Sequence, residues 1–413
     1  MARHLHYYKT QEEFEEAYNS GQYNEPWTSF VDDSSRLISF DKGYDGKKEP
    51  LTFEILEDGH IFVYYDGQDN SYTREIYWSI NDGEWNSDTP ENGHDVEIEV
   101  NAGDTVQFFG YSDYMTIIDS SSYEYYNYFG SDCEFNVCGN IMSLLDGDDF
   151  QDMERFPDES IRGVFMGLFN SCDLLIDASM LVIPVKEVTG YAYGSMFYNC
   201  ISLTTAPELP ATTLAYSCYS SMFRGCTSLT TSPELPATTL ANYCYEGMFN
   251  DCTSLTTAPE LPATALTSYC YYNMFYGCSA ITTAPSVLPA TTLAYNCYTN
   301  MFYGCSSLAT APELPATTLA SSCYYQMFSG CIALATAPEL PATTLTSNCY
   351  WGMFSGCTSL NYIKCLATNI SASYCTQTWV SGVASTGTFV KAPSMTGWTI
   401  GINGIPNNWT INV

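Results

Sequence analysis

The chain of 413 residues has little positive charge and few histidines. Its 13 Lys and Arg are outnumbered by 46 Asp and Glu, and the formal net charge is −33. Proteins bind nucleic acids and anionic membrane surfaces through basic patches, so we expect neither as a partner. The last of only four histidines is His94, which excludes a Ser/His or Cys/His catalytic arrangement in the rest of the chain.

Long apolar runs are also missing. No segment approaches the roughly 18 apolar residues that a bilayer-spanning helix needs. Residues 1–23 contain no apolar core of the kind found in secretory signal peptides. We therefore expect no membrane insertion and synthesis in a cytosol.

The acidic residues are unevenly spread along the chain. Residues 1–195 hold 39 of the 46 acidic and 10 of the 13 basic side chains, and residues 196–413 hold the remaining seven and three. The two halves of the chain therefore differ in composition.

We expect the chain to have four parts. These are a leader with a short helix at residues 10–20 that serves as a docking segment (1–48), a small β-sandwich of immunoglobulin-like or fibronectin-like shape (49–140), a repeat solenoid (141–390) and a cap (391–413). The helix is indicated by a capping box of Thr10 and Glu13. The sandwich is indicated by six strand-like runs spaced about 8 to 12 residues apart and by the turn Asn81-Asp82-Gly83.

A repeat defines the second half. The string M-F-x-x-C recurs every 26 residues, with one step of 27, at Met196, Met222, Met248, Met274, Met301, Met327 and Met353. The full unit reads C-x-x-L-T-T-A-P-E-L-P-A-T-T-L-A-x-x-C-Y-x-x-M-F-x-G. Such a period is typical of stacked coils, none of which can bury its apolar side alone.

The pattern within a unit predicts a strand and a helix. Cys244, Met248 and Cys252 fall at i, i+4 and i+8, beside Tyr245 and Phe249, which indicates one apolar helical face. A short threonine-rich run closed by proline, such as Leu229 to Ser232, indicates a brief strand. We therefore predict an α/β leucine-rich-repeat solenoid, with short parallel strands on one face and helices on the other.

Eighteen cysteines raise the question of disulfides and metal sites. Paired cysteines of one unit lie eight residues apart, about 12 Å along a helix, which is too far for a disulfide. We expect them to fill the core, although bridges between coils remain conceivable. Zinc is not expected, because the repeats lack histidine and a C-x-x-C knuckle. A bridge between Cys133 and Cys138 across a turn stays open.

Variable aromatic positions are the best candidates for binding. One tyrosine set follows the first cysteine of each unit and is expected in the core: Tyr219, Tyr245, Tyr271, Tyr298, Tyr324 and Tyr350. A second set differs between units and suits recognition of sugars or protein surfaces, or else covers apolar edges: Tyr216, Tyr243, Tyr269, Tyr272, Tyr276, Tyr295, Tyr303, Tyr325 and Trp351.

Glutamates recur at one position of the unit and should form a column: Glu208, Glu234, Glu260, Glu313 and Glu339. Such a column could attract cations, but exposure to water is the plainer interpretation. We expect no catalytic residue, no metal and no cofactor.

The repeat unit, with its proline-closed strand and its M-F-x-x-C segment, resembles the BspA-like leucine-rich-repeat family over residues 164–390. The resemblance implies an adhesive surface protein of bacteria, or a virion protein of phages that infect gut bacteria. Three flanking parts look like those that accompany such repeats: the leader around Tyr23 to Ser29, the segment N-V-C-G-N-I-M-S-L-L and the tail from Gly387 onward. An exported adhesin should carry a signal sequence, so the charged start favours the phage interpretation.

These observations predict a non-enzymatic virion appendage, such as a tail or head fibre, made in the host cytoplasm and present in several copies or as a homo-oligomer. Its leader would bind other virion proteins, and its solenoid would bind a glycan or protein of the host surface. The alternative is a bacterial cell-surface or secreted adhesin. An enzyme acting on surface glycans is a third class, disfavoured by the missing acid/base constellation.

Overall fold

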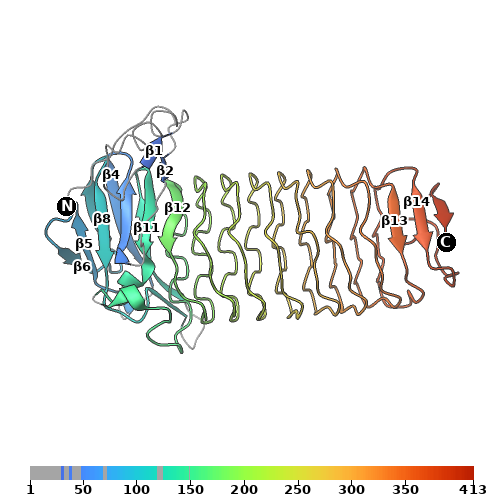
Figure 1. Ribbon diagram of the computed structural model, residues 1–413, viewed down its shortest axis with the longest axis horizontal. Helices are drawn as coiled ribbons and strands as arrows, with labels where there is room; N and C mark the ends of the chain where they lie inside the picture. Colours follow the sequence, from blue (N-terminus) through green and yellow to red (C-terminus); the bar gives the residue numbers. More distant parts are fainter. Residues whose placement is uncertain (1–28, 32–36, 40–47, 68–71, 119–123, 148) are drawn as a thin grey trace, which may run out of the picture.

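The computed structural model describes residues 29–31, 37–39, 48–67, 72–118, 124–147 and 149–413 (Figure 1). Most of the leader, including the helix expected at residues 10–20, lies outside the described residues. Two short strands within it, β1 (Ser29–Val31) and β2 (Leu37–Ser39), pair antiparallel.

Two β-sheets make up the N-terminal part. All six strands expected from the sequence form, and the turn after β5 has left-handed backbone at Asn81 and Asp82. The four-stranded sheet has the order β7-β4-β10-β9, and the six-stranded sheet has the order β12-β11-β3-β8-β5-β6. The bounds are β3 (Leu51–Ile55), β4 (Gly59–Asp66), β5 (Ile76–Ile80), β6 (Asn86–Asp88), β7 (Val96–Val100), β8 (Thr105–Phe109), β9 (Thr116–Ile118), β10 (Glu124–Ser131), β11 (Phe135–Asn140) and β12 (Leu175–Val182).

The two sheets pack against each other through phenylalanine side chains. The ring of Phe129 on β10 lies 4.9 Å from the rings of both Phe53 on β3 and Phe108 on β8. All three side chains are fully buried. Edge-on ring contacts at this distance add to the free energy gained by removing apolar surface from water.

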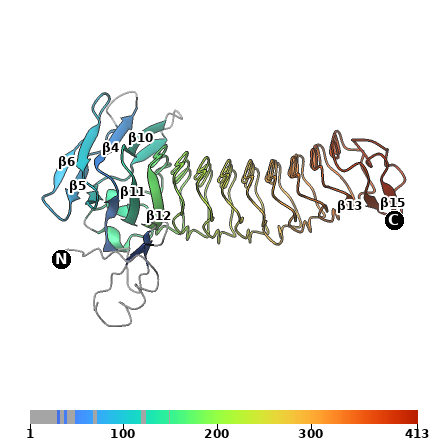
Figure 2. The same cartoon turned by 90° about the horizontal axis from the view of Figure 1, so that it is seen from above.

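The prediction of an α/β leucine-rich-repeat solenoid with helices on one face is wrong. The described part of the chain is nearly all β and contains no helix of seven or more residues. Its helical elements are two short 3-10 helices, η3 (Ile141–Leu144) and η4 (Phe150–Asp152), which precede the repeats. The 26-residue units nevertheless follow one another as single coils in a row that leads away from the two sheets (Figures 1 and 2).

A chain of consecutive turns stands where the helices were expected. In this turn segment, which runs from the first to the second cysteine of a unit, hydrogen bonds alternate in direction. The amides of Tyr245, Gly247 and Phe249 donate to the next coil, at 3.1, 2.8 and 2.9 Å, whereas the Met248 amide donates to the carbonyl of Tyr245 at 3.3 Å. An α-helix would keep all of these bonds within one segment.

A left-handed residue at every fourth position breaks the helix. In one unit these residues are Tyr243, Gly247 and Asp251, with φ of 61°, 57° and 60°. Glycine, asparagine, aspartate and serine dominate the equivalent positions in other units. All four are poor helix formers, and the first three tolerate this region best. The four-residue spacing of the buried Cys244, Met248 and Cys252 reflects this rhythm and not a helical turn.

Isolated β-bridges stand where a strand was expected in each unit. Thr205 pairs in parallel with Thr231, Thr231 with Thr257 and Thr257 with Thr283. A second line of bridges joins Thr213 to Thr239 on the far side of the two prolines of the unit. The prolines lack an amide donor, so no long ladder can form between the two lines.

The coil stack and the two sheets form one hydrogen-bonded body. β12 belongs to the first coil and pairs in parallel with β11, so the six-stranded sheet continues into the first line of threonine bridges. The four-stranded sheet continues into the turn segments, because the Phe129 amide donates to the carbonyl of Leu168 at 2.8 Å. The expected boundary near residue 140 is therefore not a flexible joint.

Columns of aromatic rings fill the interior of the stack. One column starts at Phe53 and Phe129 and runs from Phe169 through each M-F phenylalanine to Phe354, with neighbouring centroids 5.3 to 6.0 Å apart. A parallel column runs from Phe165 through the buried tyrosines to Tyr350. Both columns end on Trp379, which is fully buried.

A small sheet and two indole hydrogen bonds finish the C-terminal end. β13 (Tyr362–Cys365), β14 (Thr388–Lys391) and β15 (Thr410–Asn412) pair in parallel. The Trp379 indole donates to the carbonyl of Gly404, and the Trp409 indole donates to that of Ala384, both at 2.8 Å. These bonds tie the tail to the last coils.

All 18 cysteines are free and buried, Cys133 and Cys138 included. The second thiol of each unit donates to the backbone of the preceding coil: Cys252 Sγ lies 3.0 Å from the carbonyl oxygen of Phe223, and Cys278 Sγ lies 2.9 Å from that of Phe249. Burial raises the pKa of the Cys270 thiol to about 12. A thiol that stays protonated is a weak nucleophile, so the cysteines of the coils are core filler, and the second thiol of each unit adds one weak hydrogen bond.

We expect the folded protein to react with essentially no Ellman's reagent, and the same sample in guanidinium chloride without reductant to release 18 equivalents. The physical reason is that every sulfur is shielded in the interior of the protein, and that burial keeps the thiols of the coils protonated. Absorbance at the thionitrobenzoate band provides the count. A denatured count of 16 or fewer before reduction, restored by reductant, would reveal a disulfide and contradict this arrangement.

Candidate functional site

Exposed and half-buried aromatic side chains form a ridge along the coils. Five of the nine candidate residues lie in one group, which begins at Tyr191. Ring centroids are separated by 5.3 Å between Tyr191 and Tyr216, and by 5.4 Å between Tyr216 and Tyr243. Tyr269 then lies 4.5 Å from Tyr243, and it contacts both Tyr272 and Tyr295 at 5.6 and 5.3 Å.

A second group continues the ridge toward the C-terminus. Trp351 lies 5.6 Å from Tyr325 and 5.4 Å from Tyr374. The ridge is therefore made of two groups, residues 191–295 and residues 325–374. The remaining two candidates, Tyr276 and Tyr303, form a separate stacked pair with centroids 4.6 Å apart.

The tilt between neighbouring rings determines which faces a ligand could reach. Tyr276 and Tyr303 are parallel within 1°, and Tyr243 and Tyr269 within 10°, so each ring covers its partner's face. Elsewhere the rings are tilted by 40° or more, and Tyr216, Tyr295 and Tyr374 are 43%, 47% and 63% exposed. Accessible aromatic faces therefore gather at the two ends of the first group and around Trp351.

The set of tyrosines expected in the core is buried at every position, with exposures of 1 to 2%. Sequence reasoning missed Tyr191 and Tyr374, which lie in degenerate units at the two ends of the repeats. Tyr374 immediately precedes Cys375, as Tyr243 precedes Cys244, so the offset from cysteine was the available signal. Arg162, whose guanidinium lies 4.8 Å from the Tyr191 ring, extends the ridge at its N-terminal end.

The five glutamates of the expected column are exposed. Two of them bind neighbours within the protein. Glu260 accepts hydrogen bonds from the amide and hydroxyl of Ser286, and Glu339 forms an ion pair with Lys364 at 2.9 Å.

Across the described ranges, no group of three or more His, Cys, Asp or Glu side chains could hold a metal ion. In the same ranges, no helix is long and apolar enough to cross a membrane.

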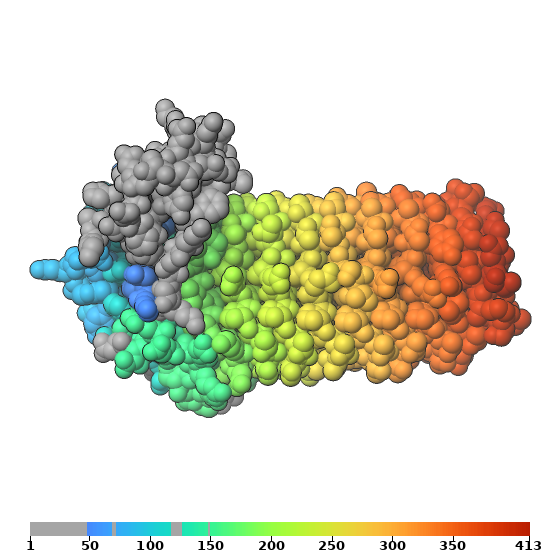
Figure 3. All heavy atoms as spheres, viewed as in Figure 1, coloured from blue at the N-terminus to red at the C-terminus, as the bar shows by residue number. Residues whose placement is uncertain are grey.

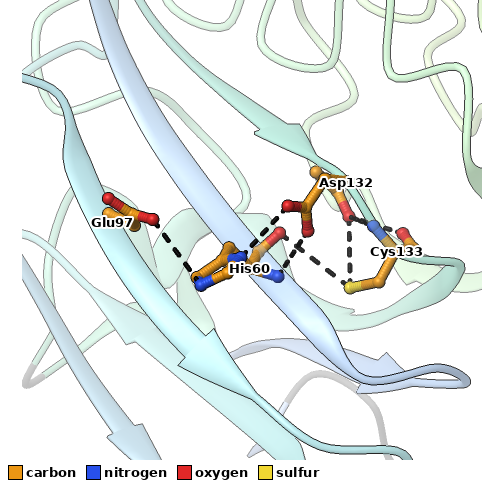
Figure 4. A network of polar contacts seen from close by, with 5 residues as sticks. His60, Glu97, Asp132 and Cys133 are labelled. Atoms are coloured by element: carbon orange, nitrogen blue, oxygen red, sulfur yellow. Dashed lines mark hydrogen bonds and ion pairs between the residues drawn. The ribbon is translucent and has the colours of Figure 1, made fainter.

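A polar network on the four-stranded sheet involves the one described histidine that binds two carboxylates (Figure 4). His60 Nδ1 on β4 lies 3.0 Å from Asp132 Oδ2, and its Nε2 lies 3.6 Å from Glu97 Oε1 on β7. The His60 amide also donates to Asp132 Oδ1 at 2.5 Å. The hydrogen bond that the His60 imidazole donates to Asp132 raises the pKa of His60, and the hydrogen bond from the His60 amide is the main cause that lowers the pKa of Asp132.

Cys133 lies next to this network but contributes no nucleophile. Its sulfur lies 3.9 Å from the carbonyl oxygen of His60 and 3.4 Å from Ser131 Oγ, so it contacts the backbone of His60 and not the imidazole (Figure 4). Burial raises the pKa of the Cys133 thiol. A catalytic cysteine needs its base within hydrogen-bond reach and a lowered pKa, and neither condition holds here. The network is a clamp between strands.

Comparisons with protein-family models, curated proteins and solved structures find no match to this chain.

We expect the His60 clamp to stabilise the sheet over a defined pH range. Because its folded pKa is raised, the contribution of His60 is fully present below the ordinary value of 6.5 and is lost as pH rises through the raised value. Because its folded pKa is lowered, the contribution of Asp132 is present above 3.8 and is lost as pH falls. The difference in melting temperature between wild type and His60→Gln should therefore be larger at about pH 5.5 than at about pH 8.5.

Differential scanning calorimetry of wild type, His60→Gln, Asp132→Asn and the double variant measures this difference. The double variant should lose no more than the larger single loss, because the two side chains act on each other. Equal losses at both pH values would show that the pair does not stabilise the protein through its charges.

Proposed function

We propose that this protein is a non-enzymatic phage virion appendage whose coil stack presents a recognition surface to the host. The observation that carries the proposal is the aromatic ridge, which lies along a stack of nearly identical coils. Aromatic side chains with two rotatable bonds give a large contact area at low entropic cost, and such side chains dominate binding energy at recognition surfaces. The placement on a particle rests on the resemblance of the repeats and of their flanking segments.

The rigidity of the stack supports this role. Each coil is bonded to the next through alternate amides of its turn segment, and the stack forms an even rod in the space-filling view (Figure 3). The two sheets at the N-terminal end are joined to it without a linker. A rod of this kind holds its binding residues at fixed positions along the coils. We propose that the leader binds other virion proteins.

The distribution of charge fits a surface-binding role for the coils. Residues 196–413 carry seven acidic and three basic side chains, while residues 1–195 carry 39 and 10. Bacterial surfaces are commonly anionic, and the nearly neutral coil stack can approach them with little repulsion. Long-range repulsion of the acidic N-terminal half is screened beyond a Debye length of roughly 8 Å at physiological salt.

A bacterial cell-surface or secreted adhesin is the second candidate. The same ridge would serve it equally well, so the two candidates differ in location and not in chemistry. Multiple copies on one particle or one cell would raise the avidity of a weak single site in either case.

The location is tested by mass spectrometry of purified phage particles from a culture that produces this protein. We expect its peptides in the particle fraction of a density gradient, at a constant ratio to the major capsid protein across the peak. Peptides confined to the cell envelope or the culture supernatant would instead support the adhesin.

The ridge is tested by binding of the full chain to host cells. Trp351→Ser introduces a residue that Ser220 already supplies at the same position of another unit, so the fold should tolerate it. We expect cell binding to weaken at least about tenfold, because aromatic anchors at recognition surfaces typically contribute about 2 kcal/mol or more.

Tyr303→Ser is the matched control, since Ser329 and Ser355 occupy its position and its ring faces its stacked neighbour. Flow cytometry with labelled protein gives the affinities, and circular dichroism checks the fold. If both variants bind like the wild type, the ridge does not recognise the host.

A further inference from the structure

A shallow groove of about 490 Å³ crosses the first coils, outside the aromatic ridge. Ligand pockets of small molecules measure about 300 to 1,000 Å³, so the groove could hold one or two sugar rings. The groove is polar and open. Its lining comprises Ser171, Asp173, Tyr198, Asn199, Ile201, Arg224, Gly225, Thr227 and Asp251.

The groove coincides with the only breaks in a row of glycines. The last left-handed position of each turn segment is occupied in order by Ser171, Asn199, Gly225, Asp251, Gly277, Gly304, Gly330, Gly356 and Gly382. All three residues other than glycine line the groove, and their φ values are 59°, 57° and 60°. Glycine takes this conformation without steric cost, and asparagine and aspartate tolerate it better than other residues that carry a side chain. Glycine occupies six of these nine positions, so the three other residues are departures from the consensus, and all three lie at the groove.

Gly225 lies between two of these positions, and its lack of a side chain leaves room for its neighbour Asn199. A Cβ atom on Gly225 would lie 2.1 Å from the Oδ1 atom of Asn199. Gly225 thus leaves the space that the Asn199 carboxamide occupies, and both residues line the groove.

Arg224 gives its repeat unit a positive charge that no other copy of the repeat has. It is the only basic residue between Lys186 and Lys364, and Ser329 and Ser355 occupy its position in later units. Its guanidinium lies 5.9 Å from the centre of the Tyr198 ring and is exposed. Among the described residues it forms no ion pair, so its donors are available to a ligand.

The donors and acceptors of the groove select a ligand class. Asp173 and Asp251 would repel a phosphate or a carboxylate. Arg224 would repel a metal ion, and the groove offers no third carboxylate to hold one. An apolar ligand would leave the charged groups without partners. Carboxylates, a guanidinium, an amide and a tyrosine ring together suit vicinal hydroxyl groups and the apolar face of a neutral sugar.

We propose that this groove is a saccharide subsite that binds one neutral sugar residue of a surface glycan. This inference rests on the proposed host-recognition function and names the chemical class of its ligand. Arg224 and Asp251 donate to and accept from adjacent hydroxyls, and Tyr198 supports the ring.

The test restores the repeat consensus. Arg224→Ser and Asp251→Gly place in the groove the residues that later units carry, so their melting temperatures should equal or exceed that of the wild type. The full-length variants and wild type are applied to an array of neutral and acidic glycans, and the strongest neutral glycan is titrated by isothermal calorimetry. We expect each variant to bind at least about tenfold more weakly, the loss that removal of a charge-assisted hydrogen bond produces.

Two further variants separate this proposal from the proposed function. Glu313→Gln removes an exposed carboxylate from a distant coil and should bind like wild type. Loss of glycan binding in Trp351→Ser together with full binding in Arg224→Ser would overturn the groove and leave the ridge standing. Failure of the wild type to bind any neutral glycan, or binding of acidic glycans alone, would also overturn it, whatever the particle analysis finds.

Discussion

The structure depends on one constraint, the alternation of backbone hydrogen bonds in the turn segments. Every second amide donates to the next coil, and the amides between them close turns within their own coil. This alternation requires a left-handed residue at each fourth position, and it places the two cysteines and the methionine of a unit on the interior side. Because each coil is bonded to the next in the same register, equivalent side chains stack in columns. The phenylalanine and tyrosine columns, the aromatic ridge and the groove all follow from that stacking.

The sequence predicted which residues are interior but not the backbone that holds them there. Cys244, Met248 and Cys252 are buried as expected, yet they lie on turns and not on a helix. Spacing of four residues fits both conformations, and the decisive signal was the residue before each of these positions: Tyr243, Gly247 and Asp251 in this unit, and mostly glycine, asparagine or serine in the others. A glycine inside a helix costs about 1 kcal/mol relative to alanine. Glycine, asparagine and serine that recur at every fourth position therefore argue against a helix, although the apolar pattern alone fits one.

The candidate site was predicted in part. The variable aromatic positions are residues of a tandem repeat, so stacking brings Tyr216, Tyr243 and Tyr269 together as their offsets suggest. Ring orientation could not be predicted, because it depends on the local tilt between coils. The groove was harder to see, since Asn199, Arg224 and Asp251 are each about one unit apart and share no motif. Their common property, departure from the repeat consensus at adjacent coils, is visible only after the chain is wound into register.

The single coil of 27 residues shows where this architecture tolerates change. Its extra residue falls at Ser286 and Val287, in the connection between the two lines of threonine bridges, while the turn segments on both sides keep their spacing. An insertion there is absorbed by a local bend, but one inside a turn segment would shift the alternating bonds out of phase. A gain or loss of one entire unit by recombination between the near-identical repeats would disturb neither end. The length of the rod can therefore change in steps of about one interstrand spacing, ~4.8 Å, so the reach of the protein can vary by genetic rearrangement while its two ends stay constant.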